Sequence, residues 1–155
     1  MGEREKKLEA AGFPLDRGPK QGPVIDLLSI LGTTLYASGQ VPYDAGVLTS
    51  KGKVPSQVSV EDATKAAALC AANILRAIIT ELGSLDRIDR VVRVTGYVNT
   101  DPDFTDCHLI INGATNLLKD VFGPDAGRHA RTALGMGQLP LGTSVEVEAI
   151  FQLKT

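Results

Sequence analysis

An arginine and a glutamate in the last quarter of the chain carry the strongest chemical signal in the sequence. Arg131 lies near the start of an apolar, glycine-containing segment, Ala130 to Gly135. A guanidinium in such surroundings is hard to solvate and favours a carboxylate or phosphate that its planar fork can bind. Glu146 lies in the last alternating segment, on the face opposite the apolar one. If the two segments pair through the turn at Pro140, both charged groups approach one site.

Two interpretations of this pair are open. In the first, Arg131 and Glu146 form a buried or cross-strand ion pair that serves only the fold. In the second, the arginine anchors an anionic ligand and the glutamate orders a water or moves a proton beside it. The spacing of the two residues supports either, so the functional interpretation needs an argument from elsewhere.

The familiar catalytic and ligand-binding motifs are missing from the sequence. It contains no GxGxxG after a predicted strand, no GxxxxGK[ST], no HExxH and no GxSxG. Ser38 has no evident partner histidine, and His108 and His129 stand alone, which favours structural or surface roles for both. Cys70 and Cys107 lack metal-ligand spacing and are expected to be reduced and buried. The sequence therefore predicts no metal site.

Hydrophobic periodicity and breaker residues predict the elements that must position these groups. In the first half, the expected elements are a helix over residues 1–12, an irregular segment from Phe13 to Pro23, a hairpin of Val24–Ile30 and Thr34–Ser38 turning at Leu31–Thr33, a loop from Pro42 to Val58 with a short strand at Val47–Thr49, and a helix capped by Ser59 and ended by Gly83. In the second half they are a strand over Val91–Val98, a helix from Asp103 to the Gly123–Pro124 stop, a strand over Ala130–Leu139, a turn at Leu139–Gly142 and a strand over Val145–Leu153.

This order of elements, ββ-α-β-α-ββ after a leading helix, predicts an α+β fold in which two helices lie on one face of a mainly antiparallel sheet. The 155 residues are expected to form a single domain, 1–155, in which residues 1–21 are an N-terminal extension with a short helix.

The composition of the chain argues against nucleic-acid and membrane partners. Sixteen Lys and Arg against eighteen Asp and Glu give a net charge of −2, without the basic excess typical of nucleic-acid binding. No apolar run approaches the roughly 20 residues that span a bilayer, so no membrane partner is expected. The charged N-terminus lacks the apolar region of a secretory signal, which predicts a cytoplasmic protein.

Three segments resemble a known family. Residues 129–134 (His-Ala-Arg-Thr-Ala-Leu), the Leu139–Pro140 pair and residues 145–149 (Val-Glu-Val-Glu-Ala) resemble the C-terminal signature of the YjgF/YER057c/UK114, or Rid (reactive intermediate deaminase), family. Residues 36–42 (Tyr-Ala-Ser-Gly-Gln-Val-Pro) are similar to its SGQ-P segment. The resemblance extends over about residues 22–153 in the family's order.

The resemblance implies a chorismate-mutase-like fold, a mixed sheet backed by two helices, and a homotrimer with ligand pockets between subunits. It implies hydrolysis of reactive 2-imino or enamino acids to 2-keto acids and ammonia, without a cofactor. In this sequence Arg131 would bind the substrate carboxylate and Glu146 would lie near the attacking water. Ser38, Gly39 and Asn112 would line the pocket.

Two positions depart from the pattern of many deaminating members. Val24 follows Gly22–Pro23 where those members carry a tyrosine, and Ala133 stands where the family often has a cysteine two residues after the key arginine. The alternative is therefore a non-catalytic trimer that binds a small 2-keto or amino acid and regulates a partner. A ribonuclease activity is disfavoured by the acidic charge balance and the lack of a plausible pair of histidines.

Overall fold

The computed structural model describes all residues from Met1 to Thr155 as two layers, one of strands and one of helices. The helices are α1 (Glu3–Ala10), α2 (Val60–Leu82) and α3 (Cys107–Phe122), with short 3-10 turns η1 (Leu15–Arg17), η2 (Leu85–Arg87) and η3 (Pro140–Gly142). The strands are β1 (Leu28–Leu31), β2 (Thr34–Gln40), β3 (Tyr43–Asp44), β4 (Val47–Leu48), β5 (Ile88–Asn99), β6 (Ala130–Met136) and β7 (Val145–Leu153).

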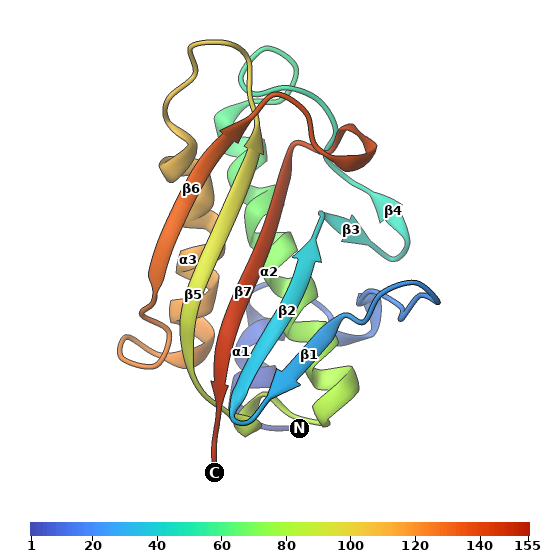
Figure 1. Cartoon of the computed structure of the whole chain (residues 1–155), viewed down its shortest axis with the longest axis vertical. Helices are drawn as coiled ribbons and strands as arrows, with labels where there is room; N and C mark the ends of the chain where they lie inside the picture. Colours follow the sequence, from blue (N-terminus) through green and yellow to red (C-terminus); the bar gives the residue numbers. More distant parts are fainter.

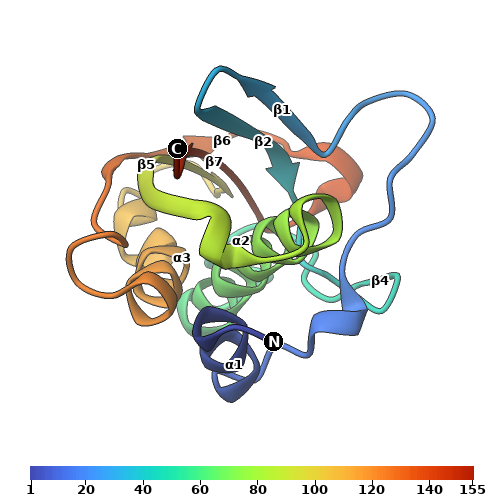
Figure 2. The same ribbon diagram turned by 90° about the horizontal axis from the view of Figure 1, so that it is seen from below.

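The main sheet has five strands in the order β1-β2-β7-β5-β6. All neighbouring pairs are antiparallel except β5 and β6, which run parallel. Figures 1 and 2 show all three helices on one face of this sheet, while no helix covers the other face. The predicted α+β class is confirmed, and the uncovered face raises the question of what lies against it.

Helix α2 is the centre of the helical layer. Ser59 Oγ accepts a hydrogen bond from the Asp62 N–H at 3.0 Å, and Gly83 ends the helix with a left-handed φ of 81°. Both ends were predicted. By length and composition α2 could cross a membrane, but 67% of its most apolar stretch of 18 residues is buried inside the fold. Its small alanines allow close packing on the sheet, so its apolar surface belongs to the core.

The largest errors in the predicted boundaries, four residues each, are at the starts of β1 and α3. The first strand begins at Leu28, and Val24 and Ile25 precede it as exposed, irregular chain. Helix α3 begins at Cys107, because Asp103 takes a left-handed φ of 70° that a helix cannot contain. Asp101 holds this preceding loop, since its carboxylate accepts hydrogen bonds from the Ser56 N–H and hydroxyl.

The predicted hairpin between the last two strands was also wrong. β5 lies between β6 and β7, and β6 pairs only with β5. A β-strand that is followed by a helix and another strand favours a parallel crossover, and β5-α3-β6 is such a unit. The crossover places α3 directly beside β6, which decides where Arg131 lies.

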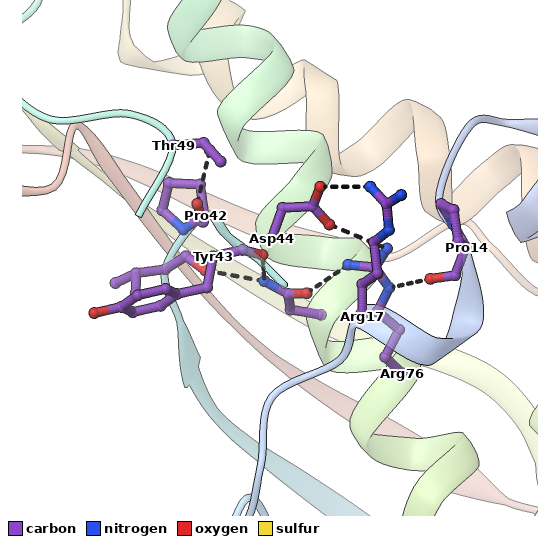
Figure 3. A network of polar contacts seen from close by, with 9 residues as sticks. Pro14, Arg17, Pro42, Tyr43, Asp44, Thr49 and Arg76 are labelled. Carbon is purple, nitrogen blue, oxygen red and sulfur yellow. Dashed lines mark hydrogen bonds and ion pairs between the residues drawn. The ribbon is translucent and has the colours of Figure 1, made fainter. Parts of the chain in front are cut away.

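A buried arginine ties the N-terminal segment and the β3–β4 hairpin to α2 (Figure 3). Arg76 is 1% exposed; its Nε donates to the Pro14 carbonyl at 2.8 Å and its Nη1 to Asn73 Oδ1 at 2.9 Å. Asp44 Oδ1 lies 3.8 Å from Nη2 and supplies the opposite charge. Asn73 in turn donates to the carbonyls of Val41 and Tyr43. The charge of Arg76 is therefore compensated, and its role is to join these three segments.

Candidate active site

Arg131 lies near the start of β6 and its side chain crosses to α3. Nη1 donates to Asn112 Oδ1 at 2.8 Å and to Thr115 Oγ1 at 3.1 Å, and Nη2 donates to the His108 carbonyl at 3.3 Å. All three acceptors are neutral, and none of the chain's four ion pairs involves Arg131. The guanidinium is thus fixed in direction while its charge is not neutralised.

His129 supports this arrangement through Thr115. Its Nδ1 lies 2.7 Å from the Gly127 carbonyl, which can only accept, so Nδ1 carries the proton. Burial lowers the pKa of His129, the bond to Gly127 raises it, and the charges of Arg131 and Lys119 lower it further. The neutral ring therefore accepts from the Thr115 hydroxyl at Nε2, 3.1 Å away, and leaves that oxygen to accept from Arg131.

These residues line an open cleft of about 540 Å³ between α3, the loop after it and β6. We refer to it as the Arg131 cleft; its lining residues are Asn112, Thr115, Lys119, Pro124, Arg128, His129 and Arg131. It contains three arginine or lysine side chains and no carboxylate. Such a cleft attracts a small anion, because an unpaired, partly buried charge favours a counter-ion.

Glu146 lies in a different place, on the sheet face that no helix covers. A Cβ at Gly39 would lie too close to its carboxylate, so any larger residue there would displace the end of the Glu146 side chain. Gly39 and Ser38 form an irregularity in the pairing of β2 with β7, and Ser38 Oγ donates to the Asp26 carbonyl at 2.6 Å. On the same face, the Tyr97 hydroxyl donates to Glu148 Oε1 at 2.9 Å. We refer to Ser38, Gly39, Tyr97, Glu146 and Glu148 as the Glu146 face.

The electrostatics of this face raise the pKa of Glu146. Partial burial raises the pKa of the Glu146 carboxyl, and the neighbouring charge of Glu148 raises it further. Burial and the hydrogen bond to Glu148 also raise the pKa of Tyr97. A carboxylate with a raised pKa is a better base near neutral pH than an ordinary glutamate.

Within one chain, Arg131 and Glu146 lie on opposite faces of the sheet. Arg131 is in register with Val94, which is buried under the helices, and Glu146 is in register with Tyr97, three residues further along β5. Because side chains alternate along a strand, positions three apart point to opposite faces. The chain therefore contains no Arg131–Glu146 ion pair, and the expectation that a hairpin would bring the two together was wrong.

The other sequence candidates fall into the same two groups. Asn112 contacts Arg131, whereas Gly39 and Ser38 belong to the side of Glu146. Sequence reasoning missed Thr115 and Lys119, although they follow Asn112 at three- and four-residue steps on one face of a predicted helix. It also assigned His129 only a general structural or surface role.

The candidate residues do not extend into the largest cavity of the chain or into a metal site. A larger cavity, of about 790 Å³, lies beside α1, α2 and α3 and contains none of the candidate residues; the charged pair Asp44 and Arg76 in its lining is compensated. No group of three His, Cys, Asp or Glu side chains could hold a metal ion. Both cysteines are buried and free, as predicted.

The fold and the two groups of residues define a class of protein. Residues 5–152 match the family described as "YjgF/chorismate mutase-like, putative endoribonuclease". The chain belongs to this family, the YjgF or Rid family, and has its chorismate-mutase-like α+β fold.

Individual relatives agree with this placement. The chain is 40% identical over 124 residues to Protein TCP17 of Trypanosoma cruzi, covering 79% of this chain and 76% of the relative. It is similar to the crystal structure of a protein of unknown function from Agrobacterium tumefaciens, with 40% identity, a TM-score of 0.89 and coverage of 97% of this chain and 92% of that one. A protein of Shewanella oneidensis MR-1 described as a "putative endoribonuclease" gives 29% identity, a TM-score of 0.91 and coverage of 98% and 100%.

Proposed function

We propose that this protein hydrolyses reactive 2-imino or enamino acids to 2-keto acids and ammonia, at a site formed between two copies of the chain. The observation that carries the proposal is the state of Arg131. Its guanidinium is held by neutral acceptors on α3 in a polar cleft, with no carboxylate of the chain to neutralise it. A substrate carboxylate would supply the missing charge and bind to the remaining N–H groups.

The chemistry needs no cofactor, because the carbon of a protonated imine is already electrophilic. With the carboxylate anchored on Arg131, a water adds its oxygen to the imine carbon and loses a proton to Glu146. Glu146 returns this proton to the nitrogen of the resulting carbinolamine. The C–N bond then breaks while the hydroxyl loses its proton to Glu146 and forms the C=O bond, so that ammonia leaves and a 2-keto acid remains. Anchoring and a positioned base account for the acceleration.

Assembly follows from the positions of the two residues. Since one chain presents Arg131 and Glu146 on opposite faces of its sheet, a site that uses both requires the Glu146 face of one copy against the Arg131 cleft of another. A homotrimer, as the family resemblance implies, would also cover the sheet face that no helix covers in Figure 2. Sedimentation equilibrium tests this directly, and a monomer of about 16 kDa would contradict it.

The test of the activity is keto-acid release from enzymatically generated 2-iminopropanoate and 2-iminobutanoate. We expect the native chain to accelerate release, Arg131→Ala to abolish the acceleration, and Glu146→Gln to lower it about a hundredfold while sparing ligand binding. Arg90→Ala and Glu81→Gln are the matched controls, because Arg90 is an exposed arginine on β5 and Glu81 an exposed glutamate on α2, away from both groups of residues. Full turnover in Glu146→Gln would contradict the role of Glu146.

A second candidate is a trimer that binds a 2-keto or amino acid without converting it. It is favoured by Ala133, which lies two residues after Arg131 on the same face of β6 and offers no thiol to the cleft. A correctly assembled trimer that binds pyruvate through Arg131 but accelerates no imine hydrolysis would support this function instead.

The family description also names an endoribonuclease. Against that activity here stand the net charge of −2 and the state of His129, both of whose ring nitrogens are occupied by Gly127 and Thr115. RNA cleavage by a highly purified protein would support an endoribonuclease activity. Its persistence after Arg131→Ala would place it at another site.

A further inference from the structure

The Arg131 cleft contains more positive charge than one carboxylate requires. Lys119 and Arg128 line the same cleft as Arg131, and neither side chain makes an ion pair or a hydrogen bond within the chain. The ion pairs of the chain lie elsewhere: Lys65 contacts Glu61 and Asp62, and Arg17 and Arg76 share Asp44. The cleft thus brings three permanent cations together in one lining that contains no carboxylate.

The three cations reach the cleft from β6, α3 and the loop between them. The guanidinium of Arg131 is bonded to Asn112 and Thr115, and Lys119 follows Thr115 by four residues on α3. Four residues of an α-helix advance about 6 Å, so Lys119 lies about one turn beyond the anchor of Arg131. Arg128 reaches the cleft from the loop that follows α3. His129 adds no charge, because its pKa is lowered and its two nitrogens are engaged.

We propose that the substrate carries a second acidic group, so that the protein acts on the imine of a dicarboxylic amino acid. This inference rests on the proposed function and specifies its substrate class. The 2-carboxylate binds Arg131, and the distal carboxylate of a four- or five-carbon chain binds Lys119 and Arg128. The 540 Å³ of the cleft accommodates such a molecule, and its lining of polar residues and one proline offers little to an alkyl side chain.

The bond changes are those of simple imine hydrolysis. Water forms the new C–O bond, the C–N bond breaks and ammonia leaves, while the distal carboxylate keeps its charge throughout. Lys119 and Arg128 therefore act in binding and orientation, and they determine specificity rather than the chemical step.

The test compares 2-iminoglutarate with 2-iminopropanoate, each generated in place by an amino-acid oxidase. We expect the native kcat/KM to be at least about tenfold higher for the dicarboxylate. In the double variant Lys119→Met/Arg128→Met this ratio falls to about one. The matched control, Arg90→Met/Lys154→Met, removes the same charge from outside the cleft and keeps the native ratio, which separates local binding from the overall charge.

A native ratio near one, or a tenfold ratio that survives Lys119→Met/Arg128→Met, would overturn the inference while leaving imine hydrolysis intact. If neither imine is hydrolysed faster than in buffer, the proposed function fails instead. Calorimetry with 2-oxoglutarate and pyruvate then tests the cleft by itself. Tighter binding of 2-oxoglutarate that is lost in the double variant supports the two-carboxylate cleft, and equal affinities overturn it.

Discussion

Arg76 and Arg131 are both held by the side chains of a helix, yet they lie in opposite electrostatic situations. Arg76 is almost fully buried, bonded to Pro14 and Asn73, and accompanied by Asp44. Arg131 is half-buried in an open cleft and bonded only to neutral groups. A compensated arginine joins segments of the fold, whereas an oriented but uncompensated one is prepared for a ligand. If burial alone were used to identify the ligand-binding arginine, it would point to Arg76 instead of Arg131.

The largest expected effect is on stability, at Arg76. Arg76→Met removes the group that satisfies the Pro14 carbonyl and Asn73, and it leaves Asp44 with only its exposed partner Arg17. We expect a loss of about 3 kcal/mol in the free energy of unfolding, measured by urea denaturation at fixed protein concentration. Keto-acid release below the unfolding transition should stay at the native level. Native stability in this variant would contradict the role of Arg76 in joining segments of the fold.

The converse change is Arg131→Lys, which keeps the charge but replaces a planar fork by a point charge. An ammonium cannot bond to Asn112, Thr115 and the His108 carbonyl and also present two parallel donors to a carboxylate. We expect kcat/KM for imine hydrolysis to fall about thirtyfold, with the urea midpoint close to native. Native kinetics would show that only the charge at this position matters.

A smaller effect is expected in the pH profile when the charge beside Glu146 is removed. The base must be ionised, so turnover falls as the pH drops through the raised pKa of Glu146. Glu148→Gln removes the like charge that contributes to this shift, so the pKa of Glu146 should fall and the acidic limb of the profile should move to lower pH. Partial burial, the main cause, remains, so the limb should stay above that of an ordinary glutamate. An acidic limb that does not move would show that Glu146 is not the group whose ionisation controls turnover.

The smallest effect concerns Arg17, the exposed partner of Asp44. Its Nη1 lies 3.0 Å from Asp44 Oδ2, but its side chain is 48% exposed. Arg17→Ala should therefore cost at most about 1 kcal/mol, and less at high salt. A loss as large as that of Arg76→Met would mean that Asp44 depends on Arg17 and that the charge of Arg76 is poorly compensated.

Local signals allowed much of the fold to be predicted from the sequence, and non-local pairing was where prediction failed. Ser59 and Gly83 mark the ends of α2 because a cap and a left-handed glycine depend only on neighbouring residues. The start of α3 was missed because it depends on the loop that Asp101 and Ser56 hold, 45 residues apart. The pairing of β6 with β5 was also missed, although the strand-helix-strand order predicts a parallel crossover.

The same limit applies to the candidate site. Arg131, Asn112, Gly39 and Glu146 were all identified from residue types and family resemblance, but their division between two faces depends on strand order. The compensation of Arg76 was beyond sequence reasoning, because Asp44 and Pro14 lie 32 and 62 residues away along the chain. Charge balance at an arginine is a property of the folded chain.

The most direct test of a site shared between copies is complementation between two inactive variants. Arg131→Ala and Glu146→Gln chains are unfolded together, refolded as a mixture and assayed for keto-acid release from 2-iminopropanoate. If the cleft of one copy works with the Glu146 face of the next, the mixture recovers about a quarter of native activity, since random assembly restores both residues at one site in four. Mixing Arg131→Ala with the Arg131→Ala/Glu146→Gln double variant is the control and should recover none. A mixture no more active than its parents would contradict the shared site.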